Sequence, residues 1–202
     1  MRHYLFGYGS LISRESRLRT GKTGTAMPVL VRGLQRAWNF AAPRMKMTAV
    51  GVVVQESASC NGILMQIEES ELPSFDKREG VGTNHGYRRL EIQPTQVIGL
   101  AAEDLRTMTT WGYFVNRPTA PTSECPIVQS YVDVILSGCL ELGEDFAVEF
   151  IRSTFGWDNV WHNDRAHPRY VRHTDTSGCQ AKIDGLLGKW AASGFAGRKD
   201  TL

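Results

Sequence analysis

The sequence predicts an α+β fold in which a small mixed β-barrel is flanked by helices. Short apolar segments, rich in β-branched and aromatic residues, follow one another closely between residues 4 and 115, a pattern typical of a barrel or closed sheet. Few helical segments interrupt them, and the longest helical pattern comes afterwards, over 127–142. At 202 residues, the chain can bury one full hydrophobic core.

The first expected strand leads into a glycine-rich turn. Tyr4-Leu-Phe6 has the bulky profile of a buried strand. Gly7 and Gly9 then supply either a positive φ or a close backbone approach. A turn of this kind can direct successive N–H groups into one concavity that binds a carboxylate or phosphate. Taken alone, an ordinary corner between a strand and a loop explains the pattern equally well.

Further strands are expected along the first two thirds of the chain, bounded by turn residues. The polar stretch 56–61 is interpreted as a turn that joins two of them into a hairpin. The segment 36–40 is either a continuation of the strand before it or a partner for it. The expected strands are 29–34, 36–40, 49–55, 62–67, 87–92, 96–100 and 107–115.

Helices are expected where capping residues flank an apolar periodicity. The first covers 71–79, between Ser70 as the N-cap and Gly80 as the stop. The longest covers 127–142, where Pro126 occupies a first helical position. A third covers 145–154.

One carboxylate in the first of these helices stands out. Leu72, Phe75 and Glu79 lie at helical spacing, so Glu79 shares the apolar face. Partial burial and a place at the negative end of the helix dipole both raise the pKa of such a carboxyl, which suits a general base. The alternative is an exposed glutamate at a frayed helix end.

Residues 1–155 are expected to form the main domain, and residues 156–202 a C-terminal extension packed on it. Trp157 and Trp161 are expected to attach the extension by their aromatic surfaces; the alternative is that they line a site or fix an interface together with the Asp and Arg at 164–165. Basic residues follow them, which either meet a substrate carboxylate or form a solvated face; these are Arg169, Arg172 and His173. The tail from Ser193 onward is expected to be disordered.

Composition indicates an ordinary soluble globular chain, with 42% hydrophobic and 22% charged residues. A net charge of +2 is too small to indicate a nucleic acid or a membrane as partner. The N-terminus lacks the pattern of a secretory signal, and no stretch has the length of a membrane span. The four cysteines form no CxxC pair, which favours reduced thiols and a cytoplasmic location; they are Cys60, Cys125, Cys139 and Cys179.

Two motifs together resemble the γ-glutamylcyclotransferase superfamily, the AIG2-like and ChaC-like proteins. The sequence Tyr-Gly-Ser-Leu stands at 8–11, after the first strand. The sequence Asp-x-x-Glu-Gly-Val stands at 76–81 and is followed by Gly-Tyr at 86–87. The order and separation of the motifs match the family over roughly residues 3–150. The leucine at 11 is more similar to the ChaC and bacterial branches than to the mammalian enzyme.

The resemblance implies cyclisation of a small γ-glutamyl compound to 5-oxoproline, with release of an amine or amino acid. It implies Glu79 as the catalytic acid and base, with Asp76 as the fallback base. No cofactor or metal is needed, and the protein would be a monomer or a homodimer. A packed core tyrosine explains Tyr131 equally well. The substrate-binding residues implied are Tyr8, Gly9, Ser10, Leu11, Tyr87 and Tyr131.

A different class of function uses the same features. A non-catalytic module could bind a small acid in the same turn without any turnover. The Glu79 carboxylate favours the enzyme, because a binding module has no need of a base. Formation of 5-oxoproline from γ-glutamyl compounds distinguishes the two.

Overall fold

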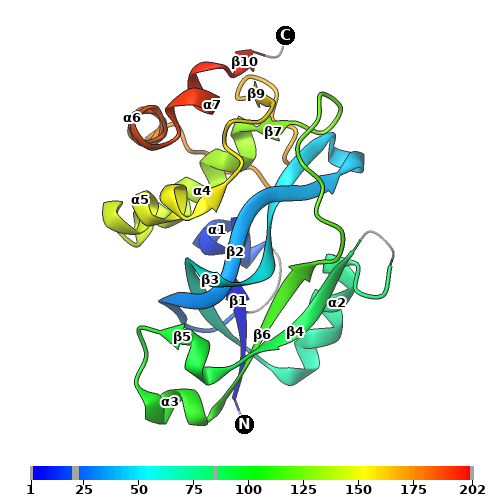
Figure 1. Cartoon of the computed structure of the whole chain (residues 1–202), viewed down its shortest axis with the longest axis vertical. Helices are drawn as coiled ribbons and strands as arrows, with labels where there is room; N and C mark the ends of the chain where they lie inside the picture. The colour runs from blue at the N-terminus through cyan, green and yellow to red at the C-terminus, as the bar shows by residue number, and fades with distance from the viewer. Residues whose placement is uncertain (1, 20–22, 84–85, 201–202) are drawn as a thin grey trace.

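Two long paired strands organise the fold in the computed structural model, which describes residues 2–19, 23–83 and 86–200. Strand β2 (Ala26–Ala42) and strand β3 (Met47–Ile67) are antiparallel along their length, with bulges between Arg32 and Leu34 and between Trp38 and Phe40. A 3-10 turn, η2 (Pro43–Met45), joins them. The segment 36–40 is therefore a continuation of the strand before it (Figure 1).

The predicted hairpin between 49–55 and 62–67 is wrong. Residues 56–61 stay within β3, and Ser59 and Asn61 pair with Arg32 and Leu30 of β2. The side chains around residues 55–57 are exposed on this part of the strand. Their polar character therefore reflects solvent exposure and not a change of chain direction.

The other strands extend this pair into a seven-stranded mixed sheet within the described residues. The order is β4-β6-β1-β3-β2-β5, with β8 paired to β2. Strand β1 is parallel to β6, and β2 is parallel to β8. The added strands are β1 (Arg2–Gly7), β4 (Tyr87–Ile92), β5 (Val97–Ile98), β6 (Met108–Val115) and β8 (Thr154–Phe155).

The α+β class is confirmed, but the sheet is not closed into a barrel. Its terminal strands β4 and β5 lie at opposite ends of the strand order and do not pair with each other. The helices of the described residues are α1 (Arg14–Leu18), α2 (Leu72–Glu79), α3 (Ala102–Arg106), α4 (Gln129–Glu141), α5 (Glu144–Arg152), α6 (Gln180–Trp190) and α7 (Ala192–Ala196). Short 3-10 turns are η1 (Ser10–Ile12), η3 (Glu69–Glu71) and η4 (Pro94–Gln96).

Two apolar clusters form the core. The larger joins the sheet to α4, α5 and α6 through fully buried side chains such as Trp38, Ile135 and Phe150. The smaller places Leu72 and Phe75 of α2 against strands β1, β3, β4 and β6. Helix α4 begins two residues later than predicted, because Ile127 and Val128 form a short strand, β7, beside strand β9 (Trp161–Asn163).

The C-terminal segment, residues 156–200 of the predicted extension, packs against α4 and gathers at the end of the molecule opposite the N-terminus (Figure 1). Strands β7 (Ile127–Val128), β9 (Trp161–Asn163) and β10 (Lys199–Asp200) form a second, parallel sheet. The expectation of disorder from Ser193 onward differs from the structure, which places α7 and β10 there. Phe195 packs edge-on against Trp161, and Arg198 stacks on Phe195.

The cysteines in the structure are free: Cys60 and Cys139 are buried, and Cys125 and Cys179 are partly exposed. None of the helices in the described ranges combines the length and the apolar character needed to cross a membrane.

Candidate active site

The loop that follows β1 runs close to α4. Gly9 has a φ of −136°, so it does not supply a positive φ. A Cβ atom at Gly9 would lie 2.9 Å from Cγ2 of Val50 and 3.0 Å from the Tyr131 hydroxyl. Of the two roles predicted for this glycine, the structure shows the close backbone approach.

Buried polar contacts brace the loop from behind. The Tyr8 hydroxyl donates a hydrogen bond to the backbone carbonyl of Tyr113. The guanidinium of Arg36 is fully buried and donates to the backbone carbonyls of Asn61 and Phe150, and over 3.4 Å to that of Tyr8. The backbone of Ser10 forms a hydrogen bond with the Tyr131 hydroxyl. These contacts fix the loop between the sheet and α4.

Helix α2 carries Glu79 at its last position. Gly80 ends the helix, as predicted, and it does so in the left-handed conformation with a φ of 66°. The predicted N-cap, Ser70, is wrong: Ser70 lies in η3, which precedes the helix, and Glu71 is the N-cap. Leu72 and Phe75 are buried, and the Glu79 side chain on the same face keeps only 18% exposure. The Glu79 carboxylate lies 3.1 Å from Nε of Arg78.

Burial raises the pKa of Glu79 above its ordinary value. The positive charges of Arg78 and Arg172 oppose this effect and lower it. Desolvation is the larger influence, so the carboxylate holds a proton more readily than an exposed glutamate does.

Tyrosine hydroxyls surround this carboxylate. Burial, and then the negative charge of Glu79 among other neighbours, raises the pKa values of Tyr8, Tyr87 and Tyr131. All three hydroxyl groups therefore stay protonated at neutral pH. That of Tyr8 donates to the Tyr113 carbonyl, and those of Tyr87 and Tyr131 are the donors left for the pocket.

The loop, the helix end and the tyrosines line one pocket. All seven residues predicted for the site lie in its wall, although the motifs that carry them are distant in the sequence. They come from the loop after β1, from the end of α2, from β4 and from α4. The lining residues are Phe6, Gly7, Tyr8, Gly9, Ser10, Leu11, Val50, Arg78, Glu79, Tyr87, Tyr113 and Tyr131.

Asp76, the fallback base, does not line this pocket. Its carboxylate lies 3.0 Å from Nη1 of Arg89 and accepts a hydrogen bond of 2.9 Å from the Tyr113 hydroxyl. Both of its oxygens thus have partners on neighbouring strands. This arrangement makes Asp76 a support for α2 and leaves Glu79 as the carboxylate of the pocket.

Arg78 and Tyr113 also line the pocket, although the sequence did not predict them as site residues. Arg78 precedes Glu79 in the helix and lies about 100° away from it around an ideal helix, so periodicity places it off the apolar face. Tyr113 is one of several aromatic residues in an alternating strand, and nothing in the pattern distinguishes it. The one signal for Arg78 in the sequence was its position directly before Glu79, the candidate base.

The chain is similar to known proteins in its sequence, through a family model, and in its fold, through solved structures. The model of the family described as "Gamma-glutamyl cyclotransferase, AIG2-like" matches residues 5–131. None of the curated proteins matches the chain. A solved structure described as "Gamma-glutamyl cyclotransferase" has 18% identity and a TM-score of 0.56, and the match covers 74% of this chain and 86% of that one.

Two further solved structures share the fold. An uncharacterized protein from Homo sapiens gives 18% identity, a TM-score of 0.56, and coverage of 74% of this chain and 86% of its own. YkqA from Bacillus subtilis gives 19% identity, a TM-score of 0.51, and coverage of 72% of this chain and 51% of its own. At these identities, the likeness to the solved structures concerns the fold.

Proposed function

The chain belongs to the AIG2-like gamma-glutamyl cyclotransferase family, and from this membership we propose that it cyclises γ-glutamyl compounds to 5-oxoproline. Family membership supports cyclotransferase-type activity in general. The substrate class and the role of each residue in the pocket are parts of the proposal.

The reaction takes place within one substrate molecule. The α-amine of the glutamyl group attacks its own γ-carbonyl carbon, a new C–N bond closes the five-membered ring, and the γ-amide C–N bond breaks. The α-ammonium must first lose a proton, and the leaving nitrogen must gain one. Because nucleophile and electrophile are already joined, the site has to hold a folded conformer and to move this proton.

Glu79 carries the proton in this proposal. Its carboxylate accepts the proton of the α-ammonium and returns it to the nitrogen that leaves. The observation that carries the proposal is the place of Glu79: a carboxylate with 18% exposure and a raised pKa lines the same pocket as the glycine loop. A pKa nearer to neutral suits a group that must both accept and return a proton.

The loop at 8–11 holds the glutamyl half of the substrate. Gly9, Ser10 and Leu11 line the pocket, so backbone N–H groups of the loop are close to a bound carboxylate. Tyr87 and Tyr131 bound the pocket on its other sides and supply neutral hydroxyl donors. The Tyr131 hydroxyl lies against the loop at Gly9.

The test is direct formation of 5-oxoproline by the purified protein. Glutathione, a γ-glutamyl amino acid and a γ-glutamyl amine form the substrate panel, and we expect turnover of at least one of them. The N-acetylated form of each compound is the matched control, because its blocked amine cannot close the ring. Binding of these compounds without any 5-oxoproline would support the non-catalytic module instead.

A further inference from the structure

A cation and an anion lie side by side in the wall of the candidate pocket. Arg78 and Glu79 are the charged residues among the described side chains that line it, and Nε of Arg78 lies 3.1 Å from Oε1 of Glu79. Both side chains are largely buried, with 16% and 18% exposure. Solvent ions therefore screen the two charges little, and a ligand in the pocket meets both of them.

The ion pair with Glu79 uses only part of the Arg78 guanidinium. Nη1 of Arg78 is buried and has no hydrogen-bond partner among the described atoms. Arg89 and Arg198 also leave Nη1 without a hydrogen-bond partner, but neither of them lines the candidate pocket. A buried donor without an acceptor costs free energy. A ligand that brings an acceptor to Arg78 recovers that free energy.

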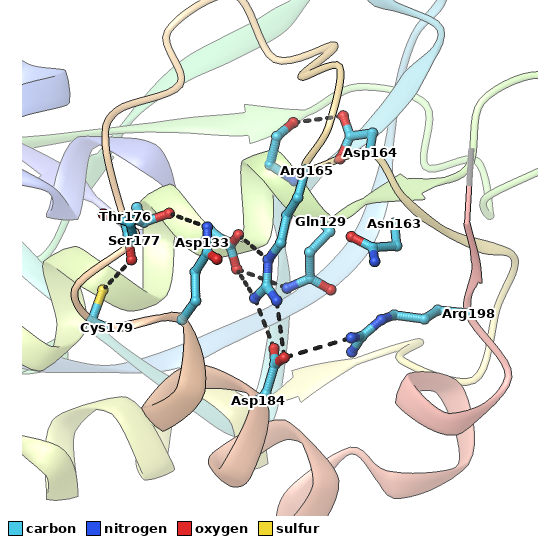
Figure 2. Close-up of polar contacts among 12 residues, drawn as sticks. Gln129, Asp133, Asn163, Asp164, Arg165, Thr176, Ser177, Cys179, Asp184 and Arg198 are labelled. Atoms are coloured by element: carbon cyan, nitrogen blue, oxygen red, sulfur yellow. Dashed lines mark hydrogen bonds and ion pairs between the residues drawn. The ribbon is translucent and has the colours of Figure 1, made fainter. Parts of the chain in front are cut away.

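Arg165 shows how the same protein satisfies an arginine that joins two helices. Its guanidinium donates two hydrogen bonds to Asp133 of α4 and two to Asp184 of α6 (Figure 2). Two carboxylates thus occupy the Arg165 guanidinium, whereas Arg78 contacts one carboxylate through Nε. Among the described arginines, Arg78 combines an unused buried donor with a place in the wall of the pocket.

The charge of Arg78 also acts on the tyrosines of the pocket. It opposes the rise in the pKa values of Tyr87 and Tyr131, as it does for Glu79. These residues come from β4, from α4 and from the end of α2, and they line the pocket together. An anion bound among them would therefore lie in the field of a cation and next to neutral hydroxyl donors.

The α-amino acid group of a substrate carries the complementary pair of charges. Its α-ammonium and its α-carboxylate are attached to one carbon atom, and the two charges of the pocket are likewise in contact. With the ammonium at Glu79, the carboxylate comes next to Arg78. The reversed orientation would bring like charges together at both residues, which is unfavourable.

We propose that Arg78 binds the α-carboxylate of the glutamyl group through its unpartnered Nη1 while its Nε holds Glu79, so that the base is directed at the α-ammonium. The inference rests on the proposed cyclotransferase function and assigns recognition of the α-carboxylate to one residue. The loop at 8–11 can share this carboxylate with Arg78, because its two oxygens accept several hydrogen bonds.

The test compares two compounds that differ in one charge. In the second compound, a carboxamide replaces the α-carboxylate of γ-glutamyl-alanine. The α-amine, the γ-carbonyl and the alanine leaving group are the same, so both compounds can close the ring. We expect kcat/KM of the natural protein to be at least about tenfold higher for γ-glutamyl-alanine, as for one charged hydrogen bond.

Arg78→Gln should remove most of this preference. Loss of the cation also changes the surroundings of Glu79, but that effect is common to both compounds and cancels in the ratio of their kcat/KM values. We expect the ratio to fall by about tenfold. An unchanged ratio in the folded variant would show that Arg78 acts on Glu79 alone and would overturn the inference. A natural protein that prefers neither compound would overturn it too.

Lys77→Gln is the matched control. Lys77 is the exposed cation directly before Arg78 in α2, and it does not line the pocket. Its ratio should equal that of the natural protein. A similar loss of preference in Lys77→Gln would mean that the net charge of the helix end sets the preference, and the inference would fail.

Arg78→Lys is the second variant, in case Arg78→Gln does not fold. Lysine keeps the positive charge, but it lacks the planar fork that lets one guanidinium contact Glu79 and a substrate carboxylate together. The ratio should again be smaller than in the natural protein. A folded Arg78→Lys protein with the natural ratio would show that the charge alone is sufficient, against the two-sided contact proposed here.

A binding measurement separates this inference from the proposed function. The product 5-oxoproline and its carboxamide are titrated calorimetrically into the natural protein and into Arg78→Gln. We expect the natural protein to bind 5-oxoproline about tenfold more tightly than the carboxamide, and the variant to bind both alike. If the natural protein cyclises neither glutamyl compound, the proposed function fails. The assignment of the carboxylate to Arg78 then stands only if this preference depends on Arg78; absence of binding or of preference refutes it as well.

Discussion

At the scale of single residues, opposing influences set the state of Glu79. Burial raises the pKa of its carboxyl, while Arg78 and Arg172 lower it. Desolvation dominates, so the group is closer to a proton-transferring state at neutral pH than an exposed glutamate is. The protonated hydroxyls of Tyr87 and Tyr131 supply donors that do not compete for the transferred proton.

The raised pKa has a consequence for stability that does not depend on turnover. An unfolded glutamate has a pKa of about 4.3, and Glu79 in the folded protein keeps its proton to a higher pH. The contribution of Glu79 is therefore fully present below the unfolded pKa and is lost as pH rises through the folded pKa. We expect the free energy of unfolding of the natural protein, minus that of Glu79→Gln, to fall as pH rises above about 4.

Urea unfolding at a series of pH values measures this difference. Glu56→Gln, at an exposed position in β3, controls for the loss of one negative charge. A difference between the natural protein and Glu79→Gln that stays constant across the acid range would show that burial does not perturb Glu79.

The spacing of apolar residues in the sequence predicted that Glu79 points inward, but it did not predict the charged residues that act on it. Leu72 and Phe75 define the buried face of α2, and the helical repeat places Glu79 on it. The same repeat places Arg78 off that face, yet at the helix end its side chain reaches the pocket. The charge of Arg172 lowers the pKa of Glu79 from a segment far along the chain, and no local pattern encodes this influence.

At the scale of elements, the loop after β1 is shaped by its contact with α4 and β3. Gly9 is needed because Val50 and the Tyr131 hydroxyl lie within 3.0 Å of any Cβ there. The backbone conformation itself does not require glycine through a positive φ. The loop, the strand and the helix thus define the pocket wall together.

Gly9→Val should weaken binding of 5-oxoproline more than tenfold, because the side chain forces the loop away from Val50 and Tyr131. Overpacking of this kind costs roughly 1–3 kcal/mol, so part of the effect will appear as lost stability. Calorimetric titration of the folded variant with 5-oxoproline gives the affinity.

Gly185→Ala is the control for the glycine substitution. Gly185 lies in α6, and a Cβ there meets nothing within 4 Å. Alanine should leave 5-oxoproline binding unchanged and add up to about 1 kcal/mol of helix stability. A folded Gly9→Val protein that binds 5-oxoproline as tightly as this control would remove the loop from the site.

The strand segments were predicted better than their connections. Most expected strands lie within observed ones, because β-branched and apolar runs depend on local burial. The turn predicted at 56–61 and the predicted closure of the sheet were both wrong, because they depended on which strands pair with each other. Pairing of β2 with β3 across a bulge, and of β1 with the distant β6, depends on contacts between segments far apart in the sequence.

At the scale of the whole molecule, the C-terminal segment shares a core and a polar network with the rest of the protein. Trp157 and Trp161 belong to the same apolar cluster as Trp38 and Phe150. Arg165 bridges α4 and α6, and Arg198 lies 3.6 Å from Asp184 (Figure 2). The aromatic attachment was expected from the sequence, whereas the partners of Arg165 were not, because their spacing follows no period.

Arg165→Met should destabilise the protein by about 3 kcal/mol, because it leaves the buried carboxylate of Asp133 without its cation. Lys182→Ala is the matched control, since it removes an exposed ion pair with Glu144 and should cost less than about 1 kcal/mol. Denaturant unfolding compares the two variants. Equal costs would mean that the network does not hold the C-terminal segment in place.

The central claim is that Glu79 transfers the proton in cyclisation, and the rate of 5-oxoproline formation by Glu79→Gln tests it most directly. Glutamine keeps the size and shape of the side chain but cannot accept the proton of the α-ammonium. We expect turnover to fall by about 10²–10⁴-fold, while the fold and the binding of 5-oxoproline persist. Near-normal formation of 5-oxoproline by the folded variant would contradict the account.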